Sequence, residues 1–169
     1  MTKSEFISPL GKILLLSHQG NLIYCNWDND DCNKKYKKFL KNISEEFLSI
    51  EDECDSSTIA LALMQLREYF DGSRRNFSLP VKMRGTLFQQ SVWTELRQIP
   101  YGETRSYGEI SRKINSCKAS RAVANACGAN PLAIIIPCHR VIASDASVGG
   151  YTGGVAIKCA LLNLEQDKK

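Results

Sequence analysis

The sequence lacks the features that would place it in several common protein classes. In 169 residues no apolar run reaches the length of a membrane helix, and the first ten residues carry charges and Pro9 instead of a signal peptide's apolar core. We therefore expect an intracellular protein without membrane contact, cytoplasmic or, in a eukaryote, nuclear. There is no internal repeat or low-complexity tract, so the length suits one ordinary domain or two small ones.

Paired cysteines and clustered histidines are also missing, although the chain has seven cysteines. Their spacing is irregular, no C-x-x-C pair occurs, and only two histidines accompany them. This pattern argues against a zinc cage, and we expect neither a metal nor a cofactor. Without an export signal, a disulfide framework is not expected either. At most one cysteine should carry chemistry, and the others should be small core or surface residues.

The charge is unevenly distributed along the chain. Residues 1–80 carry 10 Lys and Arg against 12 Asp and Glu, a net charge of −2, whereas residues 81–169 carry 12 against 6, a net charge of +6. A basic half fits contacts with nucleic-acid phosphates, but it also fits an ordinary solvated surface. Charge alone does not separate these two interpretations.

Residues 1–80 are predicted to form a small α/β domain with a hairpin sheet. Apolar runs at Ile13–Ser17 and Leu22–Trp27 read as strands, and the turn-forming residues 18–21 between them favour a hairpin. A weak helical pattern follows at Tyr36, Phe39, Leu40 and Ile43. A clearer one comprises Ile59, Leu63, Leu66 and Phe70 and ends at Asp71–Ser73.

Residues 81–169 are predicted to form a mostly helical domain, which makes the chain an α+β protein. An apolar stripe at Phe88, Val92, Leu96 and Ile99 indicates one helix. Ser106 and Glu109 have capping-box spacing at the start of a second helix, and a short break separates it from a third over 118–127. Two short helices joined by a tight turn predict a helix-turn-helix. Residues 134–136 should be buried, and a last helix should span 155–164.

Cys138 is the cysteine in the most chemically suggestive context. It follows three consecutive isoleucines, so it should be buried, which makes a thiol inert unless a neighbour favours its thiolate. His139 is adjacent, but neighbours on an extended segment point to opposite faces. Contact between the two side chains would then need a backbone turn or a water molecule. By itself a Cys-His dipeptide is a weak indication of catalysis.

A carboxylate partner is suggested by the periodicity of the last helix. Ile157, Leu161 and Glu165 share one stripe, so Glu165 should face the core with the two apolar residues. A buried carboxylate needs a cationic or hydrogen-bonding partner, and His139 is a candidate. Cys–His–Glu is the arrangement of an activated nucleophile. The alternative is that Glu165 lies in solvent at a frayed helix end.

The second helix of the helix-turn-helix has an unusually small surface. Alanines occupy positions 119, 122, 124 and 126, and Arg121 and Asn125 are almost the only long polar residues. A major-groove reader would carry more long polar side chains. A small face with one arginine suits a narrow groove and an inserted side chain. Tight helix packing inside the protein would explain the alanines equally well.

Residues 85–165 resemble the O6-alkylguanine-DNA alkyltransferases, also called methylated-DNA–protein-cysteine methyltransferases. The tetrad Pro137–Arg140 is that family's active-site signature. Further matches, in order and with the family's spacing, are Phe88-Gln89, Val92-Trp93, Ile99–Gly102, Ser106-Tyr107, Arg121–Val123, Asn130-Pro131 and Tyr151-x-Gly153-Gly154. Residues 1–80 match only loosely, as the family's variable half. We therefore set the expected domain boundary between residues 80 and 81.

The resemblance implies a reaction and a set of roles. The expected function is DNA repair by direct reversal, in which an alkyl group moves irreversibly from O6-alkylguanine to Cys138; whether O4-alkylthymine is a second substrate is left open by the sequence. The target base would be flipped out through the minor groove of double-stranded DNA by a monomeric protein. The implied catalytic residues are Cys138, His139, Glu165, Asn130 and Tyr107. The implied DNA contacts are Tyr107, Ser116, Lys118, Arg121 and Ser144. The implied base pocket comprises Val141, Tyr151, Thr152 and Gly153.

The sequence also departs from the family pattern at several positions. Thr152 stands where serine is common, and Ala133 replaces a proline that lines the alkyl pocket of some members. His18 and the N-terminal cysteines do not reproduce the zinc site of some relatives. Three competing hypotheses remain open, namely a cysteine hydrolase, a DNA-binding module without chemistry, and a structural thiol protein. Of these, the presence of Cys138 argues against the second, and the ordered motifs against the third.

Overall fold

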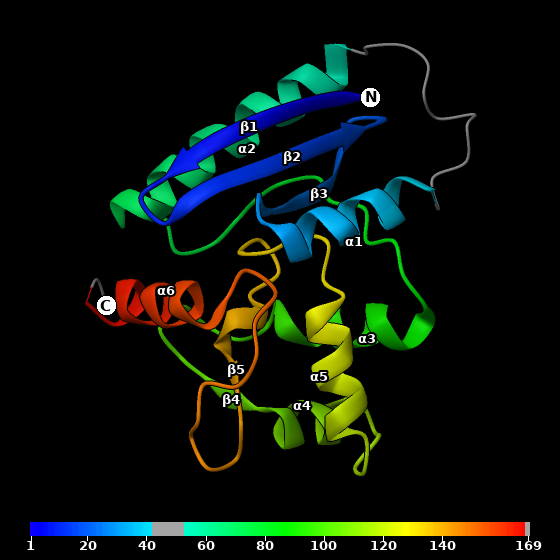
Figure 1. The fold of residues 1–169 in the computed structure, drawn as a ribbon, viewed down its shortest axis with the longest axis vertical. Helices are drawn as coiled ribbons and strands as arrows, with labels where there is room; N and C mark the ends of the chain where they lie inside the picture. Colours follow the sequence, from blue (N-terminus) through cyan, green and yellow to red (C-terminus); the bar gives the residue numbers. More distant parts are fainter. Residues whose placement is uncertain (42–52, 168–169) are drawn as a thin grey trace. The chain divides into compact units, whose positions relative to one another are not determined.

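The computed structural model describes residues 1–41 and 53–167. Two compact units account for the chain, Met1–Lys82 and Met83–Lys169. The described residues of the first unit form a three-stranded antiparallel sheet and two helices, and those of the second are largely helical (Figure 1). The predicted α+β class is therefore confirmed. Among the described residues, no helix is long and apolar enough to cross a membrane.

The sheet of the N-terminal unit has the order β1-β2-β3 and is formed by Thr2–Ser8, Gly11–His18 and Asn21–Trp27. The predicted hairpin is present as β2 and β3, whereas β1 was not anticipated. Its charged residues Lys3 and Glu5 alternate with half-buried ones, because an edge strand exposes every second side chain. Strands β2 and β3 are almost entirely buried instead. A sheet covered on both faces has this pattern.

Helices α1, Asp30–Lys41, and α2, Glu53–Asp71, cover the two faces of this sheet (Figure 1). Tyr36, Phe39 and Leu40 of α1 pack against a buried cluster formed by Leu14, Leu16, Ile23 and Tyr24. On the α2 side, the Ser17 hydroxyl donates to the Asp55 carbonyl at 2.9 Å. The apolar residues predicted for α2 are in this helix. Ile43, which we assigned to the weaker helical pattern, lies outside the described residues.

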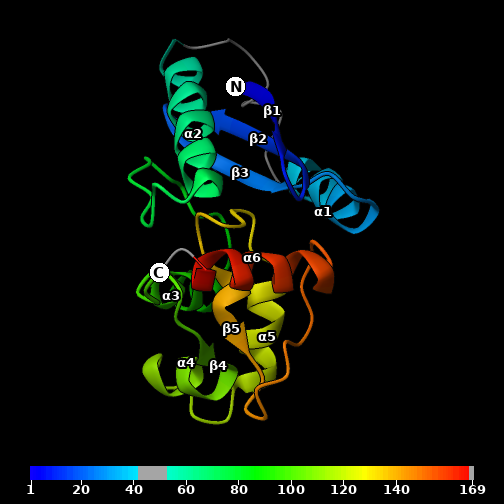
Figure 2. The ribbon, with the colours of Figure 1, turned by 90° about the vertical axis from the view of Figure 1, so that its left-hand side faces the viewer.

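The C-terminal unit contains four helices and a short parallel pair of strands (Figure 2). The helices are α3, Leu87–Leu96; α4, Tyr107–Lys113; α5, Ser120–Gly128; and α6, Val155–Asp167. The strands, Arg105–Ser106 and Val141–Ile142, are β4 and β5. The expected capping box opens α4, since Ser106 N donates to the Glu109 carboxylate at 2.7 Å and Glu109 N to Ser106 Oγ at 3.2 Å. Helix α5 begins at Ser120, two residues later than predicted. Its N-cap residue is Ala119, whose side chain cannot form a capping hydrogen bond.

One serine holds the turn between α4 and α5. The Ser111 hydroxyl donates to the Ser116 carbonyl and accepts a hydrogen bond from Ala119 N, the latter at 3.2 Å. Asn115 has φ +54° within this turn, a left-handed conformation that asparagine tolerates better than most residues. On the other side of α5, the Trp93 indole N–H donates to the Ala126 carbonyl at 2.9 Å and ties it to α3. Helix α5 is therefore held near both of its ends, by Ser111 at its start and by Trp93 close to its C-terminus.

Candidate active site

Cys138 lies in a buried position where the chain turns sharply. It begins a 3-10 turn, Cys138–Arg140, and only 5% of its surface is exposed. The Asn130 side-chain amide donates to Cys138 Sγ at 3.2 Å. Hydrogen bonding to sulfur favours the charged thiolate over the neutral thiol. The sulfur atom therefore has a donor of fixed position beside it.

Asn130 also shapes the loop that leads to the cysteine. Its Nδ2 donates to the Ile136 carbonyl at 2.8 Å, while its Oδ1 accepts from Leu132 N at 2.9 Å. Within this loop Ile134 has φ +70°, a conformation that is costly for a β-branched residue and persists only when its surroundings impose it. Residues 134–136 are buried as expected. Asn130 thus places both the loop and the sulfur atom.

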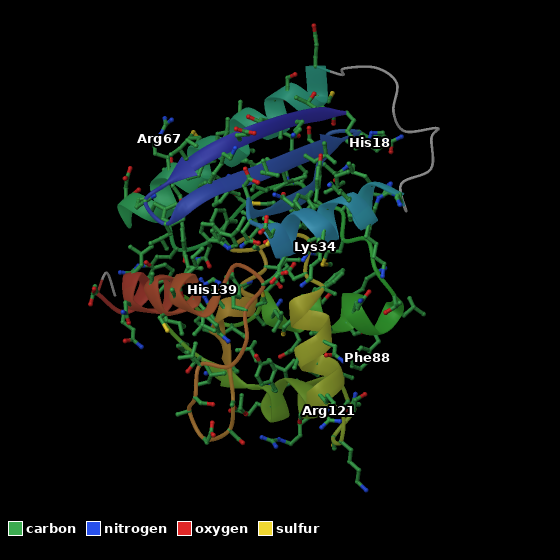
Figure 3. All side chains as sticks on the ribbon, in the orientation of Figure 1. His18, Lys34, Arg67, Phe88, Arg121 and His139 are labelled. Atoms are coloured by element: carbon green, nitrogen blue, oxygen red, sulfur yellow. The ribbon has the colours of Figure 1, made fainter. Side chains whose placement is uncertain are left out.

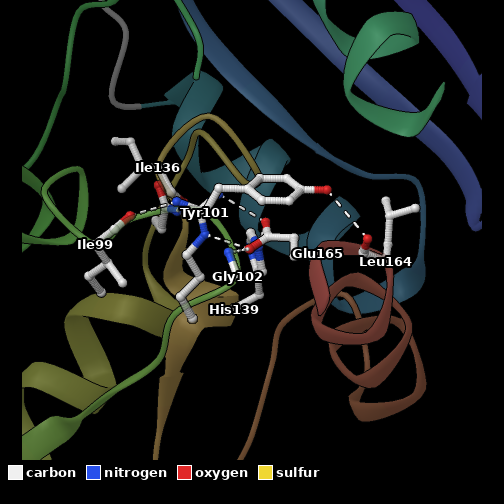
Figure 4. Close-up of polar contacts among 9 residues, drawn as sticks. Ile99, Tyr101, Gly102, Ile136, His139, Leu164 and Glu165 are labelled. Atoms are coloured by element: carbon white, nitrogen blue, oxygen red, sulfur yellow. Dashed lines mark hydrogen bonds and ion pairs between the residues drawn. The ribbon is translucent and has the colours of Figure 1, made fainter. Parts of the chain in front are cut away.

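The structure brings His139 and Glu165 together. His139 Nε2 lies 2.8 Å from Glu165 Oε1, and both side chains are fully buried (Figure 4). Glu165 therefore faces the core, as its helical spacing predicts, and is not at a frayed end. Nε2 donates to the carboxylate, which leaves the Nδ1 lone pair available. Among the described residues, no hydrogen-bond partner reaches His139 Nδ1.

Arg140 is a third member of this buried cluster. Its Nε donates to Glu165 Oε2 at 2.8 Å and its Nη2 to Glu165 Oε1 at 2.9 Å. The remaining fork nitrogen, Nη1, donates to the Ile99 carbonyl at 2.7 Å, and Gly102 N donates to Glu165 Oε2 at 3.0 Å. Figure 4 shows Gly102 and His139 converging on the carboxylate. Glu165 therefore accepts four hydrogen bonds, which compensate for its burial.

These contacts set the charges of the cluster. Burial alone would raise the pKa of Glu165, but the hydrogen bonds and charges of His139 and Arg140 outweigh it and hold this pKa far below its ordinary value. Burial lowers the pKa of His139, and the Arg140 charge lowers it further, against the opposing effect of Glu165. At neutral pH we therefore expect an ionised Glu165 beside a neutral His139. A neutral histidine can accept a proton.

A buried lysine borders the reactive centre from α6. Lys158 is fully buried, and its ammonium group donates to the carbonyls of Val141, at 2.6 Å, and Val148. It also lies 5.9 Å from the centre of the Tyr107 ring. Burial lowers the Lys158 pKa, and the neighbouring thiols of Cys138, Cys127 and Cys159 partly restore it. This lysine therefore ties α6 to the segment that follows the cysteine.

Tyr107, which was expected to act on the flipped base, lies against Gly149. A Cβ added to Gly149 would approach the Tyr107 hydroxyl to 3.3 Å, and its φ of +68° would strain the backbone of any other residue, so both effects favour glycine at this position. Val141 and Gly153 are buried, whereas Tyr151 and Thr152 are half-buried. The Thr152 hydroxyl donates to the Gly128 carbonyl at 3.0 Å. Burial, with the charges of Cys127 and Cys138, raises the pKa of Tyr107 to about 12, so its hydroxyl keeps its proton at neutral pH.

Apart from Tyr107, the residues expected to contact DNA occupy exposed or half-buried positions outside this buried cluster. Arg121 is exposed on α5 (Figure 3), and Lys118 is exposed just before this helix. Ser116 is half-buried in the turn, and Ser144 is exposed after β5. Within the described parts of the chain, no hydrogen bond or ion pair joins Arg121, Lys118 or Ser144 to the reactive centre. The exposed residues of α5 are Arg121, Ala122 and Asn125.

Comparison with known proteins decides the family. Residues 1–83 match the ribonuclease-like domain of 6-O-methylguanine DNA methyltransferase, and residues 87–167 match its DNA-binding domain. A methylated-DNA–protein-cysteine methyltransferase of Methanosarcina acetivorans is 43% identical over 160 residues, which cover 95% of each chain.

The chain belongs to the methylated-DNA–protein-cysteine methyltransferase family.

Other members of the methyltransferase family are similar over nearly the whole length. The constitutive enzyme of Bacillus subtilis is 38% identical over 160 residues, covering 94% of this chain and 92% of that one. A crystal structure of the Mycobacterium tuberculosis enzyme OGT in complex with DNA has a TM-score of 0.80 at 39% identity, with 97% of this chain and 92% of that one covered. Membership makes the chain a DNA-repair enzyme that transfers an alkyl group to a protein cysteine.

Two residues of this methyltransferase site were missed by the sequence interpretation. Arg140 was named only as part of the signature tetrad. It lies in a short 3-10 turn, where no helical periodicity indicates which side chains are buried. Lys158 could have been found, because Lys158, Leu161 and Glu165 are spaced as neighbours on one face of a helix. An inward Glu165 therefore indicates an inward Lys158.

No cluster of metal ligands accompanies the site. The described residues contain no group of three or more His, Cys, Asp or Glu side chains that could hold a metal ion. His18 is buried within β2 of the N-terminal unit, whereas Cys138 belongs to the C-terminal unit. The residues present therefore offer acid–base groups and a thiol.

Proposed function

We propose that this chain repairs duplex DNA by direct reversal, taking the alkyl group of O6-alkylguanine onto Cys138 Sγ in a single irreversible turnover. The observation that carries the proposal is the buried His139–Glu165 pair beside Cys138. With its Nε2 on the carboxylate, His139 has Nδ1 available as a base. One water molecule between Nδ1 and the thiol would complete a proton path.

The reaction requires two proton transfers, one away from the Cys138 thiol and one to the leaving guanine. The Cys138 proton passes through the water to His139 Nδ1, and Glu165 stabilises the imidazolium that forms. The thiolate attacks the alkyl carbon, so an S–C bond forms while the C–O6 bond breaks. Tyr107, still protonated, donates to the leaving guanine and regains its proton from the His139 side. The product is guanine and a thioether on Cys138, which nothing in the site can cleave.

Burial of the sulfur dictates how DNA must present its base. With 5% of Cys138 exposed, a base within an intact stack cannot reach it. The nucleotide must be flipped out, at a cost of a few kcal/mol. We propose that the small face of α5 enters the minor groove and that Arg121 fills the vacated space. Lys118, Ser116 and Ser144 would then contact the DNA backbone.

The base pocket would lie between Tyr107 and the segment from Tyr151 to Gly153. Backbone groups of Val141 and Thr152 would read the guanine edge, so a threonine hydroxyl in place of serine matters little there. Asn130 would keep the sulfur in line with the alkyl carbon. O4-alkylthymine would be a second substrate of the same pocket, and the protein would act as a monomer.

Peptide mass analysis after reaction with methyl-labelled O6-methylguanine duplex tests this proposal. We expect one methyl group per chain, on the peptide that contains Cys138, and none with Cys138→Ser, which should still bind DNA. Cys127→Ser is the matched control, because Cys127 is another buried thiol of the same unit; it should accept a methyl group normally. Label on another cysteine, or repeated turnover as in a cysteine hydrolase, would contradict the proposal.

A further inference from the structure

Helix α1 of the N-terminal unit carries a concentration of positive charge that the alkyl-transfer site does not use. Five of its twelve residues are lysines, all exposed. They are Lys34, Lys35, Lys37, Lys38 and Lys41. The acidic residues of the helix, Asp30 and Asp31, are both in its first turn. From Cys32 to Lys41 no acidic residue interrupts the run.

The apolar side of α1 fixes the direction of these lysines. Tyr36, Phe39 and Leu40 pack against the sheet, so the opposite side of the helix faces solvent. Lys37 and Lys38 lie three and four residues after Lys34, and Lys41 lies four and three residues after them, so the four lysines form a single stripe. We call this stripe the basic face of α1. Figure 3 labels Lys34 on this helix.

Helix stability does not explain this arrangement. Lys34 and Lys38 are four residues apart, as are Lys37 and Lys41, and like charges at that spacing destabilise a helix. Only the two lysines of the last turn benefit from the helix dipole. Within residues 1–41 and 53–167, Lys34 has one distant pair with Asp31, at 3.7 Å, and Lys37, Lys38 and Lys41 have no ion pair. The cluster is therefore suited to an external anion.

We propose that the basic face of α1 binds the phosphate backbone of duplex DNA, independently of any lesion. Its stripe rises about 10 Å along the helix axis, at roughly 1.5 Å per residue. Duplex DNA carries one negative charge per about 1.7 Å, so about six phosphates lie along that length. Lysine is a flexible point charge and suits contacts that do not depend on base sequence. This surface is additional to the helix-turn-helix and does not depend on alkyl transfer.

Two charge-matched triple variants test the proposal on undamaged duplex DNA. The first is Lys34→Gln, Lys37→Gln and Lys41→Gln. The control is Arg67→Gln, Arg75→Gln and Lys82→Gln, which removes three exposed cations of the same unit outside α1. We expect the first variant to bind about tenfold more weakly in about 0.1 M salt, and its slope of log K against log salt to fall by about 1 to 3, since each phosphate contact contributes about 0.9. The control should bind nearly as the wild type does.

Two further measurements separate this proposal from unfolding and from the proposed reaction. The unfolding temperature of the first variant should equal that of the wild type or be slightly higher, because repulsion between like charges on α1 is removed. Its reaction with free O6-benzylguanine should match that of the wild type, since no DNA contact is involved. Failure of the wild type to accept a methyl group from O6-methylguanine duplex would contradict the proposed function and leave the binding result standing.

Three outcomes would overturn the proposal. Unchanged DNA affinity in the first variant would mean that the lysines are solvated or are neutralised within the protein. Equal losses of DNA affinity in both variants would mean that the weaker binding results from the lower net charge of the protein and not from the basic face of α1. Binding to phosphatidylserine vesicles that the first variant loses while its DNA affinity is kept would assign the basic face of α1 to a membrane surface instead.

Discussion

Arg140 binds both carboxylate oxygens of Glu165, through Nε at 2.8 Å and Nη2 at 2.9 Å. This two-point contact leaves Oε1 shared with His139 and fixes the angle at which the histidine meets the carboxylate. The permanent charge of Arg140 also keeps Glu165 ionised in the interior. The orientation of the histidine therefore depends on an arginine that is not itself in the proton path.

Removal of Arg140 should destabilise the protein strongly. In Arg140→Met the Glu165 charge would stay buried without its cation, and we expect a loss of about 3–5 kcal/mol in the free energy of unfolding. Arg105→Met is the matched control, because Arg105 meets Glu103 at the same 2.8 Å but with both side chains about 40% exposed. That pair should contribute no more than about 1 kcal/mol. Urea unfolding of both variants measures the difference, and equal losses would refute the role assigned to burial.

Glu165→Gln tests the proton path rather than the packing. Glutamine keeps the size of the side chain but neither its charge nor its full acceptor capacity, so the imidazolium would lose its counter-charge. We expect alkyl transfer to slow by about one to three orders of magnitude. Single-turnover rates on O6-benzylguanine base, measured on protein shown to be folded, decide the matter. An unchanged rate would leave Glu165 a purely structural residue.

Arg121→Ala should separate base flipping from chemistry. If the arginine recovers about 1–3 kcal/mol of the lost stacking, repair of duplex DNA should slow roughly 5- to 150-fold, at about 1.4 kcal/mol per tenfold. Reaction with the free base should be nearly normal because no flipping is needed. Both rates are measured at saturating protein. If the variant reaches the full duplex rate at saturating protein, Arg121 only contacts a phosphate. If the variant is slowed equally on both substrates, the substitution has damaged the base pocket.

The rate should depend on pH through His139. The group must be neutral to accept the thiol proton, and burial lowers its pKa below the ordinary 6.5. The histidine-dependent rate should therefore persist through pH 6.5 and fall only in more acidic solution. Single-turnover rates on the free base between about pH 5 and pH 8 would show this. A fall that begins above pH 7 would contradict a neutral, buried His139.

Stability should fall over the same acidic range. Below pH 6.5 the unfolded chain binds a proton at this histidine before the folded chain does, so the free energy of unfolding decreases as the pH falls. Glu165 acts in the same direction at lower pH. Its pKa in the folded state is depressed below the ordinary 4.5, so its stabilising contribution is lost as the pH falls from about that value toward the folded-state pKa. Denaturant unfolding at a series of pH values measures both effects.

Local sequence was sufficient for most elements near the site. The apolar stripe of α3, the Ser106–Glu109 capping box and the buried segment 134–136 all depend on neighbours within a few residues, and the structure contains them. Strand β1 was missed because an edge strand alternates charged and half-buried residues, which gives a weak signal over seven positions. The start of α5 was misplaced because Ala119 provides no cap.

The sequence by itself predicted the helix-turn-helix and offered an inward Glu165 as one of two alternatives, because both follow from spacing along the chain, and it identified the reactive motif through resemblance to the family. Only the tertiary structure decided which partners the inward groups meet. Glu165 is 26 residues from His139 in sequence, and Gly102 is 63 residues from Glu165. Contacts at such separations form because helix α6 packs beside the turn that contains Cys138. Charged groups buried there are removed from water and are stabilised only by pairing with one another. Burial of Arg140 and Lys158 has the same cause, since each satisfies carbonyl or carboxylate groups that packing had removed from solvent.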